Sequence, residues 1–176
     1  MPTYVAFLRA INLGATRKFP KDAIVAVTEG AGFGDVATHI NTGNVRLTTA
    51  MRSRARIEAA LEAAYLADRG FEVPTIVYAP AELRAVHEHA AAATHDGQRY
   101  VALLRDDPTG EGVAALRERT GPGERVEVGG RAVHVYVGAN GVHGTRLTNP
   151  LVEKCLGTTS TWRSPSVVAT LVERWC

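Results

Sequence analysis

Short apolar runs and helix-spaced apolar positions alternate along the first half of the chain. Thr3 to Arg9 is predicted to be a strand, and its continuous apolar run is typical of a strand buried on both faces. A helix is predicted from Pro20 to about Ala31, because proline fits a first helical position and glycines follow the last apolar one. The remaining predicted elements are strands at 36–41 and 44–49 around Thr42-Gly43, a helix from Ser53 to Gly70 and a strand at 73–78.

The predicted order of these elements is β-α-β-β-α-β, which is the order of the split β-α-β, or ferredoxin-like, unit. We therefore expect residues 1–79 to form a ferredoxin-like α+β unit. Residues 80–96 are expected to link this unit to the rest of the chain, mainly through a helix from Pro80 to about Ala93.

The second half of the chain partly repeats this pattern, so residues 97–176 are predicted to form a second, related α+β unit with C-terminal helices. The run from Tyr100 to Leu104 is again apolar on both faces, which indicates that each sheet is covered twice. After it we expect a helix at 110–119, strands at 125–128 and 132–137, a helix at 146–156 and a further helix in place of a final strand.

Three stretches of sequence carry a likeness to a known family. They are Leu8-Arg9-Ala10-Ile11-Asn12-Leu13-Gly14 with Lys18 after it, Thr42-Gly43-Asn44-Val45, and Leu147-Thr148-Asn149 leading to Glu153-Lys154-Cys155-Leu156-Gly157 and Thr161-Trp162-Arg163. In their order and spacing the chain resembles the bacterial domain-of-unknown-function 1697 family. The family commonly has glycine where this chain has Ala10, and Asn-Trp where it has Ser164-Pro165. The resemblance supports the fold and brings no established activity with it.

Composition narrows the range of functions. Two cysteines, Cys155 and Cys176, are too few for a disulfide framework, and no leader sequence opens the chain, so we expect a cytoplasmic protein. No apolar run approaches the roughly 18 residues needed to span a bilayer, so a membrane protein is not expected. The net charge of +2 is too small to favour a protein that binds nucleic acid through counterion release.

The predicted topology brings one set of polar residues together. The first two strands of a ferredoxin-like unit run parallel, so the loop after the first strand and the hairpin after the second lie at the same edge. No acidic residue precedes Asp22, and the following helix directs its first backbone N–H groups to this edge, an arrangement that suits an anion. The candidate anion-binding residues are Arg9, Asn12, Gly14, Arg17, Lys18, Asn41, Gly43 and Asn44. In the alternative interpretation, the Asn and Gly residues only form turns and the arginines are solvated.

Arg146, Asn149 and Arg163 are secondary candidates for an anion site near the C-terminus. The alternative is structural: these residues clamp the last two helices, with Thr161 and Ser164 as helix caps. A further basic run at Arg52, Arg54 and Arg56 falls on the opposite edge of the first unit and is interpreted as a solvated helix face.

Neither a metal site nor a cofactor is predicted. His87 and His89 point to different faces of their helix, and Ala91 stands where a zinc-protease motif requires histidine. The glycines at 30–34 follow a helix rather than a strand, so they do not match a dinucleotide-binding loop. Strand 44–49 has no aromatic residue with which to stack RNA bases.

Three functions follow from these patterns. The first is a binding or regulatory protein that holds a small phosphate-bearing ligand, or a short nucleic-acid segment, at the Arg9–Lys18 edge. The second is a phosphate-ester or acyl-phosphate hydrolase, by analogy with the ferredoxin-like acylphosphatases, in which Arg17 would hold phosphate and Asn41 would position water. The third is a structural or interaction module, either monomeric or homodimeric.

Overall fold

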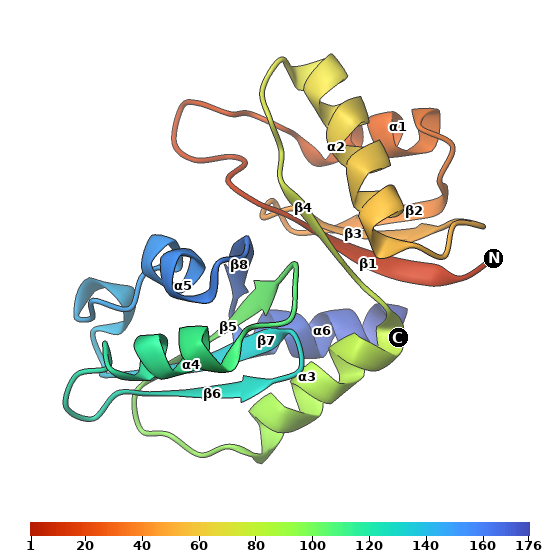
Figure 1. Cartoon of the computed structure of the whole chain (residues 1–176). Helices are drawn as coiled ribbons and strands as arrows, with labels where there is room; N and C mark the ends of the chain where they lie inside the picture. Colours follow the sequence, from red (N-terminus) through yellow and green to blue (C-terminus); the bar gives the residue numbers. More distant parts are fainter. The chain divides into compact units, whose positions relative to one another are not determined.

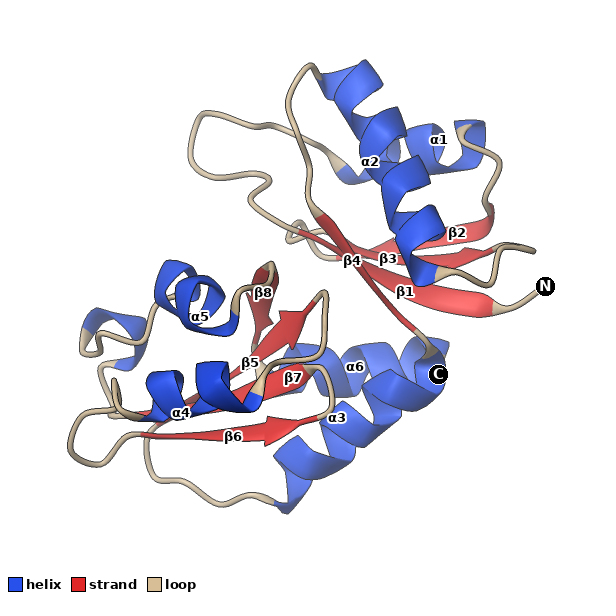
Figure 2. Ribbon diagram, viewed as in Figure 1, coloured by secondary structure: helices blue, strands red, loops and turns tan.

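The computed structural model describes all 176 residues, which form two α+β units (Figure 1). The first comprises Met1–Pro80 with Trp175, and the second Ala81–Arg174 with Cys176. Each unit has one four-stranded antiparallel sheet with helices packed on it (Figure 2), so the predicted α+β fold class is confirmed. None of the helices combines the length and the apolar character that crossing a membrane requires.

The first unit has the ferredoxin-like order of elements. These are β1 (Thr3–Leu8), α1 (Lys21–Gly30), β2 (Gly34–His39), β3 (Asn44–Thr48), α2 (Arg54–Arg69) and β4 (Thr75–Tyr78). Its sheet has the order β2-β3-β1-β4. Strands β1 and β2 both run antiparallel to β3, and Phe7 and His39 both pair with Asn44. The C-terminal ends of β1 and β2 therefore lie at one edge of the sheet, as the topology predicted.

Local signals set the ends of the helices in the first unit. The Ser53 hydroxyl accepts a hydrogen bond from Arg56 N, and Gly70 ends α2 in the left-handed conformation with a φ of 74°, so both predicted ends are confirmed. Helices α1 and α2 are joined by a buried hydrogen bond of 2.8 Å between Thr28 Oγ1 and the Tyr65 hydroxyl. Burial raises the pKa of Tyr65 to about 12, because the charged form would lose its hydration.

The second unit begins with the helix that was expected to be a linker. Its elements are α3 (Pro80–Ala92), β5 (Gln98–Leu104), α4 (Gly110–Arg117), β6 (Arg125–Gly129), β7 (Ala132–Val137), a 3-10 turn η1 (Gly141–His143), α5 (Asn149–Leu156), β8 (Ser160–Arg163) and α6 (Pro165–Trp175). The sheet order is β6-β7-β5-β8. Helices α4 and α5 pack on one face, against residues such as Ala102 and Val135. On the other face, His89 of α3 stacks on His134 of β7. Both faces of this sheet are therefore covered, as predicted.

The predictions for the C-terminal part of the second unit are partly wrong. A fourth strand, β8, lies where only a helix was expected, and it pairs antiparallel with β5. Thr161 consequently belongs to a strand and caps no helix, whereas Ser164 accepts a hydrogen bond from Val167 N and begins α6 as predicted. The helix expected from Arg146 starts at Asn149, after a cap formed by Thr148. A strand of four residues carries too little periodicity to compete with adjacent helix-capping residues.

The two units use the same backbone contacts at the end of their first strands. Leu8 N donates to the carbonyl of Gly43 at 2.8 Å, and Leu104 N donates to that of Arg131 at 2.8 Å. These bonds join the first strand of each unit to its hairpin, so Arg131 occupies in the second unit the position of Gly43 in the first. The two units are therefore structural repeats of each other.

The repeat extends to the last strand of each sheet. Glu62 on α2 accepts a hydrogen bond of 2.8 Å from Thr75 N, the first residue of β4. Glu153 on α5 accepts one of 2.9 Å from Ser160 N, the first residue of β8. Because β4 and β8 are edge strands, these carboxylates satisfy backbone donors at positions where the sheet ends.

We predict that Glu62→Ala and Glu153→Ala each lower the free energy of unfolding by about 1–3 kcal/mol, since each leaves a backbone N–H in a buried residue without its carboxylate acceptor. Urea denaturation followed by circular dichroism measures this loss. Glu29→Ala, at the exposed end of α1, is the control and should change stability little. Equal losses in all three variants would contradict this interpretation.

Candidate functional site

A cavity of about 590 Å³ opens in the first unit at the edge where β1 and β2 end. It lies between the β1–α1 connection, the start of α1 and the β2–β3 hairpin. Its lining residues are Asn12, Lys18, Pro20, Lys21, Asp22 and Asn41. The volume is in the range of sites that bind small molecules.

Asn12 holds the two loops of this edge together. Its Nδ2 donates to the carbonyls of Asn41, at 2.9 Å, and of Phe19, at 3.0 Å. Its Oδ1 accepts a hydrogen bond from Phe19 N at 2.9 Å. The amide is thus used on the protein's own backbone, so Asn12 shapes the cavity and has little capacity left for a ligand.

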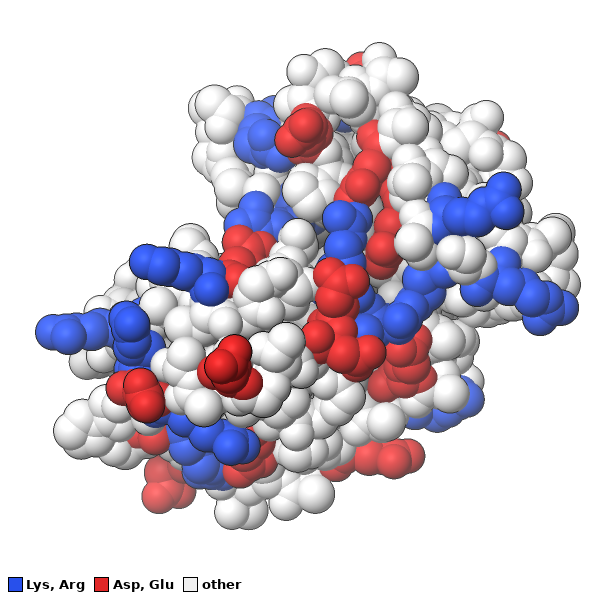
Figure 3. All heavy atoms as spheres, in the orientation of Figure 1, with Lys and Arg blue, Asp and Glu red and all other residues white.

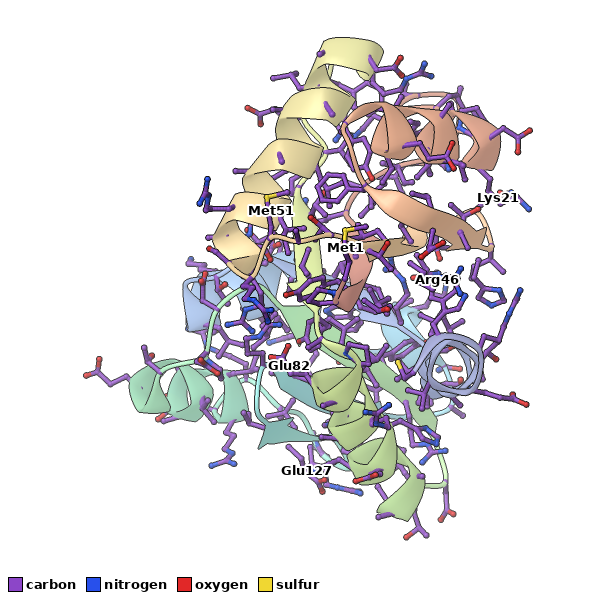
Figure 4. The ribbon with its side chains drawn as sticks, turned by 90° about the vertical axis from the view of Figure 1, so that its right-hand side faces the viewer. Met1, Lys21, Arg46, Met51, Glu82 and Glu127 are labelled. Atoms are coloured by element: carbon purple, nitrogen blue, oxygen red, sulfur yellow. The ribbon has the colours of Figure 1, made fainter.

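The charged groups on the cavity are two lysines and one aspartate. Lys18 and Lys21 are exposed, and neither ammonium group has a hydrogen bond or an ion pair in the structure. Figure 4 shows Lys21 extending outward from the start of α1. Asp22, in the first turn of α1, opposes them, so the lining carries two positive charges and one negative. The N-terminal end of the α1 dipole adds to the positive side.

Arg17 does not reach this cavity. Its Nε donates to the carbonyl of Ala10 and its Nη2 to that of Glu72, in the connection between α2 and β4. Its guanidinium lies 4.7 Å from the centre of the Phe71 ring. Arg17 therefore links the β1–α1 connection to the α2–β4 connection. It was a candidate for the site only because of its position in the sequence.

The other predicted residues of this edge also lie outside the lining. Gly43 has a φ of 78°, and a Cβ there would come within 2.6 Å of Leu8 Cβ, so only glycine fits this close approach. Asn44 is buried, and its Nδ2 donates to the carbonyl of His39 and to Thr42 Oγ1, both at 3.0 Å. Gly14 and Arg9 do not line the cavity either. Of the eight candidates, Asn12, Lys18 and Asn41 line it, while sequence reasoning missed Pro20, Lys21 and Asp22 as lining residues.

The backbone of this edge is held in an unusual conformation. Ala10, Asn12, Arg17 and Ile40 have φ values of 57°, 54°, 55° and 52°. Only one further non-glycine residue in the chain, Asp35, has a positive φ. Left-handed backbone costs roughly 1–2 kcal/mol at most non-glycine residues, so contacts such as those of Asn12 and Arg17 must hold it.

The secondary candidates do not form one site. Arg146 lines a different cavity, in the second unit. Asn149 donates to the carbonyl of Ser160 at 3.0 Å and so ties α5 to β8. Arg163 is buried and donates to Thr161 Oγ1 and to the carbonyl of Trp162, and burial lowers its pKa to about 10. Asn149 and Arg163 thus have structural contacts.

A cluster of titratable residues that sequence reasoning did not identify joins α3 to the sheet of the second unit. His89 Nε2 lies 2.9 Å from Glu127 Oε2, and Glu127, labelled in Figure 4, also accepts from Arg125 Nε at 3.0 Å. The hydrogen bonds from His89 and then Arg125 lower the pKa of Glu127. His134 stacks on His89 with ring centres 4.0 Å apart, and its buried Nε2 has no partner. Burial, and then the charge of His89, lower the pKa of His134 to about 4.

No group of three or more His, Cys, Asp or Glu side chains in the structure is arranged to hold a metal ion. The stacked rings of His89 and His134, 15° from parallel, explain why that pair does not form such a site. Metal coordination requires ring nitrogens that converge on one point, and parallel stacked rings do not provide this.

Comparison with known proteins places the chain in a family. A family model described as a protein of unknown function (DUF1697) matches residues 1–134. The chain belongs to this family. The match includes the whole lining of the first cavity, whereas the third stretch of the sequence likeness, from Leu147 to Arg163, lies beyond it.

A solved structure shares the fold over nearly the full length. It is that of SP0830, a conserved bacterial protein from Streptococcus pneumoniae, with a TM-score of 0.75 and 14% sequence identity. The match covers 98% of this chain and 97% of the other. No curated protein matches the chain. The comparisons thus establish family and fold.

We predict that Asn12→Ala lowers the free energy of unfolding by about 2 kcal/mol, because it removes three hydrogen bonds that join the two loops. Asn41→Ala is the matched control, since Asn41 contributes only its backbone carbonyl to this contact and should lose little. Thermal unfolding measures both. A larger loss in Asn41→Ala would contradict the role assigned to Asn12.

The histidine stack predicts a pH dependence of stability. His134 has a pKa of about 4 in the folded chain against 6.5 as its ordinary value, so the unfolded chain binds the proton first as pH falls. Its contribution is complete above pH 6.5 and is lost as pH falls towards 4. We expect a loss of about 3 kcal/mol at pH 4, because a difference of one pKa unit between the folded and unfolded chains corresponds to about 1.4 kcal/mol. Denaturation at several pH values tests this: His134→Phe should flatten the curve in this range, whereas the exposed control His143→Gln should not.

Proposed function

We propose that the first unit binds a small anionic, phosphate-bearing ligand in the cavity where β1 and β2 end. The observation that carries the proposal is the pair of exposed ammonium groups, on Lys18 and Lys21, that line the cavity beside the N-terminus of α1. Backbone N–H groups at a helix N-terminus and lysine ammonium groups are both donors that suit phosphate.

The comparison of the two units supports a specialised role for this edge. The connection after β1 has 12 residues, 9–20, whereas the one after β5 has five, 105–109. The hairpin between β2 and β3 has four residues, 40–43, and that between β6 and β7 has two, 130–131. The second unit forms the same kind of sheet with the shorter connections. The longer connections of the first unit, and the cavity between them, are therefore not required by the fold.

At the equivalent edge of the second unit, the position is occupied by an arginine side chain. Arg131, at the position of Gly43, is buried and donates to the carbonyls of Leu104 and Arg105, both at 2.8 Å. Its Nε also lies 3.2 Å from Glu82 Oε1. The first unit has glycine at this position, packed closely against Leu8, and places no cation there. Its cavity is lined instead by the longer loops and the start of α1, which favours a ligand in the first unit only.

The charged residues on the lining allow the affinity for phosphate to be estimated. Lys18 and Lys21 attract an anion, Asp22 repels it, and all three are exposed to solvent. Contacts of this kind contribute about 1 kcal/mol each, so we expect a dissociation constant of about 10–50 mM for inorganic phosphate. A larger phosphate-bearing metabolite would bind more tightly through further contacts with the cavity.

The hydrolase interpretation has less support. It needs Arg17 and Asn41 on one substrate, yet Arg17 donates to two backbone carbonyls away from Asn41. Binding of a nucleic-acid segment also has less support, because Figure 3 shows acidic and basic side chains interspersed over the visible face.

We expect the double variant Lys18→Ala, Lys21→Ala to weaken binding of inorganic phosphate about tenfold, because two charge-assisted contacts are lost. NMR titration of the Asn12 and Asn41 backbone amides measures the constant at the site itself. Arg52→Ala with Arg56→Ala removes the same charge near the start of α2 and should leave the constant nearly unchanged. Equal weakening in both double variants would show a nonspecific charge effect and refute the proposed site.

A further inference from the structure

The second unit contains a separate cavity of about 730 Å³. Two loops and one helix form its walls: the connection between α4 and β6, the connection that precedes α5, and the first turns of α5. The lining residues are Glu118, Arg119, Thr120, Gly121, Pro122, Glu124, Gly144, Thr145, Arg146 and Leu151.

This cavity is not the repeat of the first one. The first cavity lies where the first strand of its unit ends, beside the hairpin that follows the second strand. The second is formed by the segments that lead into β6 and out of β7, which lie at the edge where β5 begins. The internal repeat therefore does not account for it, and its chemistry has to be considered by itself.

Two arginines on this cavity have no partner in the structure. Arg119 comes from the α4–β6 connection and Arg146 from the segment before α5, and both are exposed. Neither guanidinium has a hydrogen bond, an ion pair or a ring contact. Most other arginines of the chain are engaged in such contacts; Arg99, for example, donates to the carbonyls of Ala90 and Ala93.

The lining also has two acidic residues, so its formal charge is zero and binding depends on the individual arginines rather than on a net positive charge. Glu124 Oε2 accepts a hydrogen bond of 2.8 Å from Gly121 N, so this carboxylate holds the turn at 121–124. Glu124 keeps its negative charge in this contact, and Glu118 adds an exposed one. Together they oppose a compact, highly charged anion more than an extended one that pairs with each arginine separately. Leu151 supplies an apolar wall.

We propose that this cavity binds a short organic dicarboxylate, with one carboxylate on Arg119 and the other on Arg146. The planar guanidinium pairs with a carboxylate through two parallel N–H···O bonds, and the two arginines come from different loops. The carbon chain between the carboxylates lies against Leu151. The site is independent of the one proposed for the first unit.

Succinate is the probe, and butyrate, which has the same number of carbons and one carboxylate, is the matched control. NMR titration of the full chain should show succinate binding at least about fivefold more tightly than butyrate, with shifts in the Gly121 and Gly144 amides. Arg119→Ala and Arg146→Ala should each weaken succinate binding about fivefold and so reduce it to the level of butyrate.

Two variants serve as controls for charge and for location. Arg117→Ala removes an exposed, unpartnered arginine near the end of α4 that does not line the cavity, and it should leave succinate binding unchanged. The Lys18, Lys21 double variant should also bind succinate normally, which separates this proposal from the first. Since the guanidinium groups of Arg119 and Arg146 make no hydrogen bonds, ion pairs or ring contacts, their replacement should alter the melting temperature little. Arg146→Lys keeps the charge but loses the paired N–H donors, so it should still weaken succinate binding.

The proposal is overturned if succinate binds no more tightly than butyrate, or if Arg117→Ala weakens binding as much as Arg119→Ala. It is also overturned if the amide shifts occur away from residues 118–124 and 144–146. Inorganic phosphate is a further comparison. If phosphate binds more tightly than succinate, the cavity prefers a compact anion, and the arrangement with one carboxylate on each arginine is refuted.

Discussion

The side-chain amide of Asn12 is the contact on which the first cavity depends. The connection after β1 is long, and nothing in the pairing of β1 with its neighbours fixes its course. Asn12 binds the backbone on both sides, at Phe19 within the connection and at Asn41 in the hairpin. These bonds place Lys18 and the start of α1 opposite the hairpin. The lysines themselves contribute nothing to this arrangement, so the residues that shape the site differ from those proposed to bind.

Much of the fold could be predicted because its signals are local. The apolar run of β1, the Ser53 cap and the glycine after α2 each specify an element or its end without reference to the rest of the chain. Strand β8 could not be predicted in this way. Its four residues form a strand because β5 offers a free edge, and that is a property of the assembled sheet.

The candidate site could likewise be predicted only in part. Topology alone predicted that the loops containing Asn12 and Asn41 would meet, because strand directions fix which loops share an edge. The direction of each side chain was not predictable. Arg17 turns away because Phe71 and two backbone carbonyls lie within its reach, and its neighbour Lys18 stays on the cavity. The stack of His89 on His134 joins residues that sequence spacing gave no reason to connect.

The left-handed residues of the first edge have a consequence for the way a ligand would arrive. Ala10, Asn12, Arg17 and Ile40 hold their loops in a conformation that a free chain seldom visits, and the bonds of Asn12 and Arg17 keep them there. A loop fixed in this manner loses little conformational entropy when a ligand binds. Association would then be limited by diffusion into a preformed opening, without a preceding closure of the loop, and a weakly charged pocket of this kind would exchange its contents rapidly.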